Sequence, residues 1–523
     1  MNINILDQLQ NGVEILDTID TIDTIDTIDT NEQSNCDNCD NCENQWTDTD
    51  TDSDSEQELE SEDEFDISRD VVYKVYNNRY IPIKYINRGT FSRVWLSYDS
   101  LDNSLVAIKI IFSKYQEDAE HEININERIS KRLSELNEQQ LGHTGLLQLK
   151  EYFTQDSETC LVYDVMGVGI YDLLAHIEED QYVLAETIIK RVVKDILLGL
   201  SKLHSINIVH TDLKPENILT NVYPRGVLIY KNIFEKDNDF GSYLATLINN
   251  NLPDNFSLFN KNKKKKVKRS IKHRLLPTLA EYIKEKVTER INMVSTDFFK
   301  EYNTFTDLSN SDCSTEIDLN ELTQAKSDED TGSNKITTFK EYMKELVIND
   351  YEHIVKNLNT FIIDFGNCED PQNSSQDEIS IRCYRPPENF MNSTFDTKAD
   401  IWSLGCIIYE LFTGDNLFSI DYTDDYNERD RLYLAEMSRI IGTIPKSLCL
   451  KCEYKKNLFD RNDRILEIDV PEKISIVKLM VEEYDIPETI AENVSEFLLD
   501  IFIYAPSKRK TASELLENRW LND

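Results

Sequence analysis

The 523-residue sequence has no apolar run that approaches the roughly twenty residues needed to cross a bilayer. Its first twenty residues also lack the basic start and the apolar stretch of a secretory signal, so we expect neither a membrane partner nor export. Cysteine is sparse, at ten residues, and without export reduced thiols are expected instead of disulfides. These absences predict a protein of the cytoplasm or the nucleus.

Positive charge is also scarce, above all near the start of the chain. The formal net charge is -41, and residues 1–70 contribute 23 Asp or Glu against a single Arg. The remainder is still acidic on balance, whereas nucleic-acid binding needs clustered Lys and Arg. We therefore expect no nucleic-acid partner, and a basic protein substrate fits this charge better. The composition predicts no particular oligomeric state.

Low-complexity sequence fills residues 1 to about 70. A Thr-Ile-Asp triplet repeats over residues 13–31, and Asn, Asp, Ser and Glu follow. Such a composition buries too little apolar surface to fold, so we expect a disordered acidic tail. Cys36, Cys39 and Cys42 have the spacing of metal ligands, but no fourth ligand is near, and a product of the surrounding Asn-Asp repeat is favoured over a zinc site.

The pattern changes at about residue 71. Alternating apolar residues predict a small strand-rich part with one helix at roughly 116–137, and beyond residue 185 the periodicity becomes largely helical. A spacer with a Lys run from Lys263, which reads equally as a nuclear import signal or as solvated charge, interrupts this order. Segments of the spacer, such as 276–292, have helical periodicity. The expected organisation is a tail at 1–70, a folded part at 71–220, the spacer at 221–358 and a second folded part at 359–523.

The octapeptide HTDLKPEN, from His210 to Asn217, places an acid, a cation and an amide at the spacing used for phosphoryl transfer. In that chemistry Asp212 accepts the hydroxyl proton of the substrate. Lys214 neutralises charge on the transferred phosphoryl group, and Asn217 holds a magnesium ion. We therefore predict Asp212 and Lys214 as catalytic residues.

A second magnesium ligand is expected from an Asp-Phe-Gly tripeptide, and the chain has two copies. The copy at Asp364 follows an apolar strand and precedes Glu388 of a Pro-Pro-Glu sequence by 24 residues. The copy at Asp239 follows polar residues and has no such sequel nearby. We assign Asp364 as the metal ligand, although it lies 152 positions after Asp212, and interpret Asp239 as a chance tripeptide.

Nucleotide-binding residues are predicted from the strand-rich part. Residues 87–94 (NRGTFSRV) lie where a phosphate-covering loop is expected, but only the middle one of its three glycines is kept. Lys109 of the sequence VAIK fits the lysine that contacts the alpha and beta phosphates and pairs with a helix glutamate. Spacing favours Glu122 over Glu120 and Glu127, and the adenine is expected against the linker at 160–167. The predicted set is Asn87, Gly89, Ser92, Val94, Ala107, Lys109, Glu122, Asp164 and Met166.

Two polar residues downstream are expected to hold the site in shape. Asp400, in DIWSLG, would hydrogen-bond the backbone of the catalytic loop. We predict that Arg509, near the end of the chain, forms an ion pair with Glu388. This ion pair would position the segment between Asp364 and Glu388.

With these motifs in this order, the chain resembles the eukaryotic protein kinases over about 72–523, less the spacer. It most resembles the SR-protein kinases of the CMGC group, through Thr211 where most kinases have Arg, the long spacer, Tyr384-Arg385 before Pro-Pro-Glu, and the insert after Thr413. The resemblance implies a bilobal α+β fold with a small strand-rich lobe and a larger helical lobe. It also implies ATP with Mg²⁺ as cofactors and serine phosphorylation in Arg/Ser-rich proteins.

Thr211 has a mechanistic implication within that resemblance. Without an arginine beside Asp212, no cation is poised to receive a phosphorylated activation segment, so we expect activity without such phosphorylation. We take Ser374, Ser375 and Ser380 as the serines whose replacement by Ala tests this expectation.

The chain also departs from the family pattern. Ile381 replaces a threonine that bonds the catalytic Asp and Lys. In the docking groove Asp415 fits an acidic position, but Leu432 and Arg439 replace two others, and the arginine should repel a basic ligand. Cys449 and Cys452 form a CxxC without a second pair, which disfavours a metal site.

Two other functions stay open. A pseudokinase or scaffold is motivated by Asn87, Ser92 and Ile381, which depart from the pattern of active enzymes. Another CMGC specificity, proline-directed or dual, is the narrower alternative. Retention of every catalytic residue favours the active serine/threonine kinase.

Overall fold

The computed structural model describes residues 74–136, 143–174, 182–223, 240–293, 356–372, 378–392 and 395–522, together with positions 227, 230, 231 and 234. The chain divides into the units Met1–Phe65 and Asp66–Asp523, and every described residue belongs to the second. The expectations for the tail and its three cysteines, for Asp239, and for Ser374 and Ser375 therefore lie outside the described residues.

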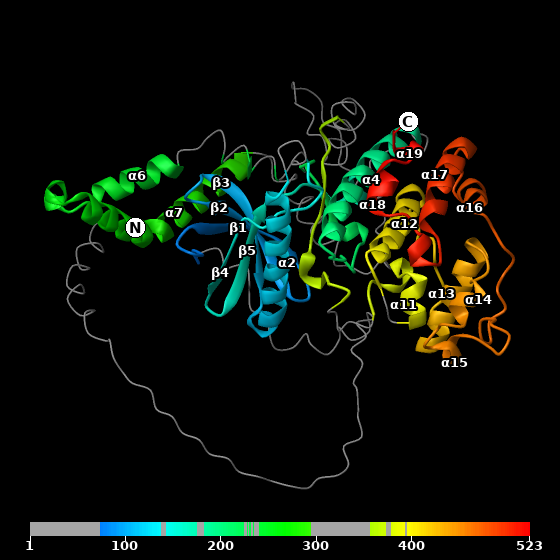
Figure 1. Cartoon of the computed structure of the whole chain (residues 1–523). Coiled ribbons are helices and arrows are strands. Elements are labelled where there is room, and N and C mark those ends of the chain that lie inside the picture. Colours follow the sequence, from blue (N-terminus) through cyan, green and yellow to red (C-terminus); the bar gives the residue numbers. More distant parts are fainter. Residues whose placement is uncertain are drawn as a thin grey trace, which may run out of the picture. The chain divides into compact units, whose positions relative to one another are not determined.

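Five antiparallel strands form the sheet of the smaller lobe, in the order β1-β2-β3-β5-β4 (Figure 1). Alternation within these strands sends Trp95, Ile108 and Val162 to one buried face. The other face carries Val94, Ala107 and Lys109 of the predicted nucleotide residues, because Val94 pairs with Lys109 and Leu96 with Ala107 across β2 and β3. The strands are β1 Tyr80–Arg88, β2 Ser92–Asp99, β3 Ser104–Ile111, β4 Glu151–Gln155 and β5 Glu158–Asp164.

One long helix, α2 (Gln116–Ser134), accompanies the sheet. Its buried residues recur at helical spacing, from Ala119 through Glu122 and Ile125 to Ile129 and Leu133. One of these, Glu122, is a carboxylate that is 3% exposed, and burial of a charge is costly unless it is paired. The helix therefore brings a single acidic side chain towards the sheet.

Helices build the larger lobe around α4 and α12 (Figure 1). Every residue of α12 from Ala399 to Leu411 is buried, which explains why this helix is mostly apolar, with Asp400, Ser403 and Glu410 as its buried polar residues. The α+β, two-lobed architecture that the resemblance implied is confirmed. The helices are α3 Ile170–Leu174, α4 Tyr182–Ser205, α11 Pro387–Asn392, α12 Lys398–Thr413, α13 Tyr426–Ile440, α14 Lys446–Cys449, α15 Lys455–Leu458, α16 Ile476–Glu482, α17 Glu488–Ile501, α18 Ala512–Leu516 and α19 Arg519–Asn522.

Two short strands lie on either side of the spacer. β6 (Ile218–Thr220) follows the catalytic loop, and β7 (Thr360–Ile362) precedes Asp364. They pair antiparallel, with Leu219 opposite Phe361. The two predicted magnesium ligands, Asn217 and Asp364, therefore lie at neighbouring ends of paired strands.

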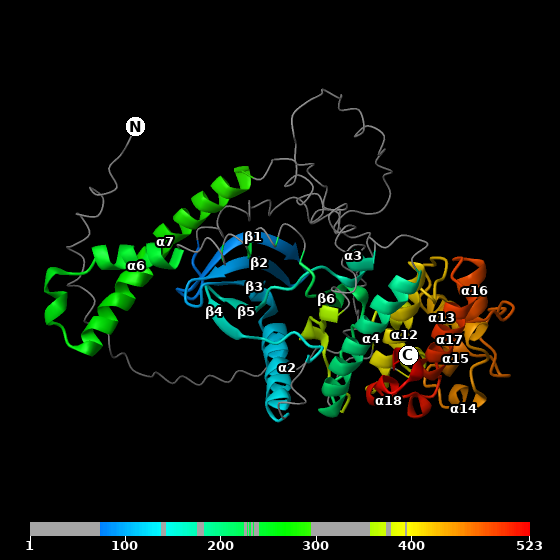
Figure 2. The same ribbon diagram turned by 90° about the horizontal axis from the view of Figure 1, so that it is seen from above.

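The spacer contributes two helices that pack on the small lobe. These are α6 (Phe240–Asn250) and α7 (Lys261–Met293), so the helical periodicity at 276–292 is confirmed. Leu276 and Leu279 of α7 share one hydrophobic cluster with Leu96 and Tyr98 of β2, and Figure 2 shows α7 beside the sheet. This first part of the spacer belongs to the core of the small lobe. None of the described helices has the length and apolar content to span a bilayer.

Leu279→Ala should lower the free energy of unfolding by about 2–5 kcal/mol, because Leu279 is fully buried and its truncation leaves a cavity. Urea denaturation would measure this loss. Thr278→Ala, at the exposed neighbouring position, should stay within about 0.5 kcal/mol of the parent and serves as the matched control. Equal stability of the two variants would show that α7 adds nothing to the core.

Candidate active site

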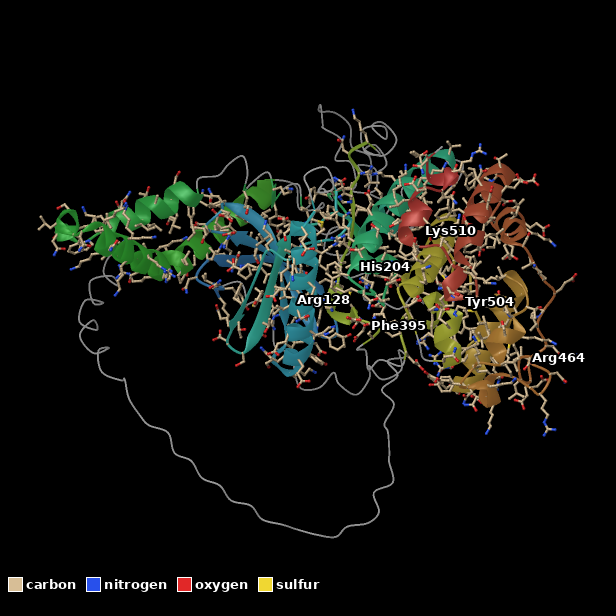
Figure 3. The ribbon with its side chains drawn as sticks, viewed as in Figure 1. Arg128, His204, Phe395, Arg464, Tyr504 and Lys510 are labelled. Atoms are coloured by element: carbon tan, nitrogen blue, oxygen red, sulfur yellow. The ribbon has the colours of Figure 1, made fainter. Side chains whose placement is uncertain are left out.

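One buried carboxylate, that of Asp400, fixes the backbone of the catalytic loop. Asp400 of α12 accepts hydrogen bonds from the backbone N–H of His210 (2.9 Å) and of Thr211 (3.1 Å), as the sequence predicted. The ring of His204, labelled at the end of α4 in Figure 3, also lies 2.9 Å from an oxygen of Asp400. Thr211 has a φ of 65°, so these bonds hold a left-handed backbone turn immediately before Asp212.

The three predicted residues of the loop converge. Lys214 Nζ lies 3.0 Å from Asp212 Oδ2. Asn217 Nδ2 donates to the Asp212 carbonyl at 2.9 Å and approaches its Oδ2 at 3.3 Å. An acid, a cation and an amide therefore share one small volume, which is the arrangement that proton acceptance and phosphoryl neutralisation require.

Lys109 joins the two lobes through two carboxylates. Its Nζ donates to both oxygens of Glu122, at 3.0 and 2.9 Å, and to Oδ1 of Asp364 at 2.7 Å. Tyr163 OH also donates to Glu122 at 3.1 Å. Burial alone would lower the pKa of Lys109, but the two carboxylates outweigh it and raise that pKa above its ordinary value. The ammonium is therefore fixed where the phosphates of a nucleotide would meet it.

The pKa values of the two carboxylates, Glu122 and Asp364, shift in opposite directions. Burial raises the pKa of Glu122 even though Lys109 lies beside it. Burial also acts to raise the pKa of Asp364, but the attraction and hydrogen bond of Lys109 prevail and lower it. Asp364 is therefore held ionised, as a metal ligand must be.

The structure distinguishes Glu122 from the two neighbouring glutamates, whereas Asp239 of the other Asp-Phe-Gly lies outside the described residues. Glu122 is buried and bonded to Lys109, whereas Glu120 is exposed and Glu127 accepts a bond from Tyr152. Asp364 contacts Lys109, while Phe240 of the other Asp-Phe-Gly packs against Phe234 in the α6 and α7 cluster, with ring centroids 5.0 Å apart.

The residues predicted to form the phosphate-covering loop lie at the turn between β1 and β2. The Gly89 N–H donates to the Ser92 carbonyl at 2.9 Å, and Ser92 is buried. Asn87 Oδ1 accepts from the adjacent Arg88 N–H at 2.7 Å. Val94 and Ala107 lie on the sheet face of Lys109, so an adenine ring would meet apolar side chains there.

At the end of β5 the predicted linker residues differ in their surroundings. Asp164 is exposed, and its Oδ1 lies 2.5 Å from Lys150 Nζ. Met166 is half-buried. The side chain of Asp164 is therefore engaged by Lys150, which leaves backbone groups to meet a base.

The donor set fits magnesium. Asp364 and Asn217 offer a carboxylate and an amide oxygen, which are the hard ligands that Mg²⁺ takes alongside phosphates and water. Within the described part of the chain no cluster of three or more His, Cys, Asp or Glu could hold a metal by protein ligands alone. Such a site would be completed by the phosphates of a nucleotide.

Sequence reasoning missed the residues that bind α2 to the segment after Asp364. His121 Nε2 lies 2.7 Å from the Cys368 carbonyl. Arg128, labelled on α2 in Figure 3, donates to the Ile206 carbonyl at 3.2 Å and to Asp370 at 3.4 Å. No local pattern marks these positions, because polar residues on a helix face give no sign of a distant partner.

Sequence reasoning also missed the role of Ser380. Ile381 has no hydroxyl, and its side chain is exposed. The neighbouring Ser380 Oγ instead donates to the Thr211 carbonyl at 2.6 Å. Thr211 Oγ1 donates in turn to the Asn367 carbonyl at 2.5 Å. Ser380 has a φ of 56°, and Arg385 Nη2 donates to its carbonyl at 3.0 Å. Ser380 therefore ties the activation segment to the catalytic loop, and it is not the neutral test position that the sequence indicated.

The predicted pair of Arg509 and Glu388 is confirmed. Arg509 is 1% exposed, and its two terminal nitrogens donate to both Glu388 oxygens at 2.9 and 3.0 Å. The guanidinium also donates to the carbonyls of Lys398 and Ile503, at 2.7 and 2.9 Å. This network anchors the helix that begins with the Pro-Pro-Glu sequence to the end of the chain.

The predicted repulsion at Arg439 is weakened by a neighbour. Arg439 donates to both oxygens of Glu436, at 2.8 and 2.6 Å, so its charge is compensated on its own helix. Asp415 accepts from Tyr484 OH at 3.0 Å, and Leu432 is half-buried.

The CxxC pair lies in the buried interior of the larger lobe. Cys449 and Cys452 are both buried, and the Cys452 thiol donates to the Met391 carbonyl at 3.1 Å. Burial raises the pKa of Cys452 to about 11, which keeps it a thiol near neutral pH.

Comparison with known proteins matches the chain to one family model. The model described as protein kinase domain covers residues 80–289 and 353–521. Curated relatives include protein kinase dsk1 of Schizosaccharomyces pombe, 24% identical over 86% of this chain and 81% of the relative. Serine/threonine-protein kinase SRPK of Physarum polycephalum (86% of this chain, 88% of the relative) and SRSF protein kinase 3 of Mus musculus (86% and 87%) are each 26% identical.

Proposed function

Because this chain belongs to the protein kinase domain family, we propose that it phosphorylates serines in Arg/Ser-rich proteins and does so without phosphorylation of its own activation segment. Family membership gives the reaction, which is ATP-dependent phosphorylation of serine or threonine in proteins. The observation that supports catalysis is the set of contacts from Glu122 through Lys109 to Asp364.

The site residues divide the work of phosphoryl transfer. Magnesium-ATP, when bound, supplies the phosphoryl group and much of the charge that neutralises it. Lys109 would hold the alpha and beta phosphates, with Asn217 and Asp364 as the protein ligands of magnesium. Asp212 would accept the proton of the substrate hydroxyl while Lys214, 3.0 Å away, balances the charge that develops.

Substrate choice is supported by the relatives and by charge. Two of the relatives are named SRPK and SRSF protein kinase 3, and this chain is strongly acidic, which favours basic partners. The compensated Arg439 removes one obstacle to an arginine-rich ligand. A cytoplasmic or nuclear location belongs to the same proposal.

A peptide array with Arg-Ser, Ser-Pro and acidic contexts tests this specificity. Transfer from ATP should be strongest to Arg-Ser peptides, and Asp212→Ala should abolish it as the inactive control. Preference for Ser-Pro or acidic peptides would reject the Arg/Ser proposal while leaving the kinase assignment intact. Equal signals from the parent and Asp212→Ala would instead favour a scaffold.

Activity without activation-segment phosphorylation has its own test. The variant with both Ser374→Ala and Ser375→Ala should keep the kcat of the parent, because Ser380 already supplies the tie to the catalytic loop. Ser380→Ala should lower kcat about five- to tenfold, which corresponds to one lost hydrogen bond. Steady-state kinetics on phosphatase-treated proteins measures both. Loss of activity in the double variant, or on phosphatase treatment of the parent, would contradict the proposal.

A further inference from the structure

A basic cavity of about 710 Å³ lies beside α4 and includes none of the residues assigned to phosphoryl transfer. Its walls come from the end of α2, from α4, and from α18 and α19 at the end of the chain. This volume is in the usual range for small-molecule sites. Four Arg or Lys side chains line it, namely Arg132, Arg191, Lys194 and Lys202.

The two arginines are oriented by contacts in the wall. Arg132 Nε donates to Ser205 Oγ at 2.9 Å, and its Nη1 lies 3.7 Å from the half-exposed Glu135. Arg191 Nε donates to the Leu358 carbonyl at 2.9 Å, and its Nη2 donates to Asn359 at 3.2 Å. A guanidinium has five N–H donors, so each arginine keeps donors for a ligand.

The two lysines are less compensated. Lys202 Nζ donates to the carbonyls of Thr144 (2.9 Å) and Leu198 (3.4 Å), and burial lowers its pKa although the charge of Asp195 acts to raise it. Lys194 is half-buried and has no ion pair or hydrogen bond within the described ranges. Cations that are partly withdrawn from water and have no ion pair of their own are stabilised by an incoming anion.

Among the described residues of the lining, the one carboxylate is that of Asp195, and it has partners within the wall. It is 1% exposed, accepts the Thr360 N–H at 2.9 Å and lies 3.4 Å from both Arg191 and His143. Burial raises the pKa of Asp195 to about 6 and lowers that of His143. The charge of Asp195 is therefore balanced in part by Arg191 and by the Thr360 N–H before an anion arrives.

We propose that this cavity binds a small polyanion bearing phosphate groups, either an inositol polyphosphate or phosphoserines of a peptide. Charge-assisted bonds from several Arg and Lys to phosphate oxygens are the strongest that such a lining can form. The concave shape, walled by three helical regions, favours a compact ligand over a flat membrane or a nucleic-acid duplex. The proposal does not depend on the substrate of the kinase reaction.

Isothermal titration calorimetry on the full chain tests the proposal, with the nucleotide site filled by a magnesium-bound, non-hydrolysable ATP analogue. One arm titrates inositol hexakisphosphate, and the other a doubly phosphorylated serine peptide, both at physiological salt. Binding in either arm supports the site, and the arm that binds identifies the source of the phosphate. No binding in both arms overturns the proposal.

Matched variants locate the binding. Lys194→Gln and Arg132→Gln should each weaken it by about tenfold or more, the loss expected for one charge-assisted hydrogen bond. Lys131→Gln makes the same charge change on α2 at an exposed position outside the lining, and Lys265→Gln with Lys266→Gln changes the basic part of α7. Both controls should bind as the parent does. Equal weakening in either control, with thermal stability unchanged, would place the binding elsewhere and overturn the proposal.

Discussion

Asp364→Asn should lower kcat by about a thousandfold or more, because a metal ion supplies several kcal/mol of charge stabilisation and about 1.4 kcal/mol corresponds to a factor of ten. The substitution removes the ionised ligand that Lys109 holds 2.7 Å away. Single-turnover transfer from ATP to a peptide, measured across magnesium concentrations, would report the loss.

Asp239→Asn is the matched control, since it makes the same change in the other Asp-Phe-Gly. Phe240 beside it packs on the small lobe in the α6 and α7 cluster, so this variant should keep the parental rate. A large loss in Asp239→Asn together with activity in Asp364→Asn would reverse the assignment of the metal ligand.

Arg509→Met should lower the free energy of unfolding by about 3–5 kcal/mol, the cost of leaving a buried ionic partner alone. Arg509 is 1% exposed and forms both bonds to Glu388, so its removal strands a carboxylate that is itself 6% exposed. The guanidinium also lies 5.0 Å from the Trp402 ring, and that contact is lost as well. Urea denaturation measures the change.

A double-mutant cycle separates the stranded charge from the lost packing. Glu388→Leu combined with Arg509→Met removes both charges, and it should be more stable than Arg509→Met alone, because no charge is left buried without a partner. Strictly additive losses would show that the pair is not coupled and that the bonds to Lys398 and Ile503 carry the effect.

The residues predicted to be catalytic could be named from the sequence because each lies in a short motif whose spacing is set by local chemistry. Lys109 and Glu122 belong to a strand and the helix that follows it, and their contact needed only the correct choice among three glutamates. The pair of Glu388 and Arg509 was predicted from chain order, although 121 positions separate them.

Other features escaped because they depend on contacts between distant segments. Helical periodicity indicated α7 but could not name the sheet face that receives Leu276 and Leu279. Ser380 gave no sign of its left-handed backbone, which is what directs its hydroxyl to Thr211. The compensation of Arg439 could have been found, since Glu436 precedes it by three residues on a helix.

Because β6 pairs with β7, the distance between the two predicted metal ligands does not depend on the length of the spacer that joins these strands. Besides the strand pairs, the Ile363 N–H donates to the Asn217 carbonyl at 3.0 Å, so the two ligand-bearing ends are bonded directly. A slip of one residue would turn the side chains to the opposite face, so insertions between the strands cannot shift the ligands gradually. Lengthening a long connection also costs little, about 0.6 kcal/mol for each doubling. Outside the α6 and α7 segments that pack on the small lobe, this connection can therefore change in length while the two predicted magnesium ligands keep their separation.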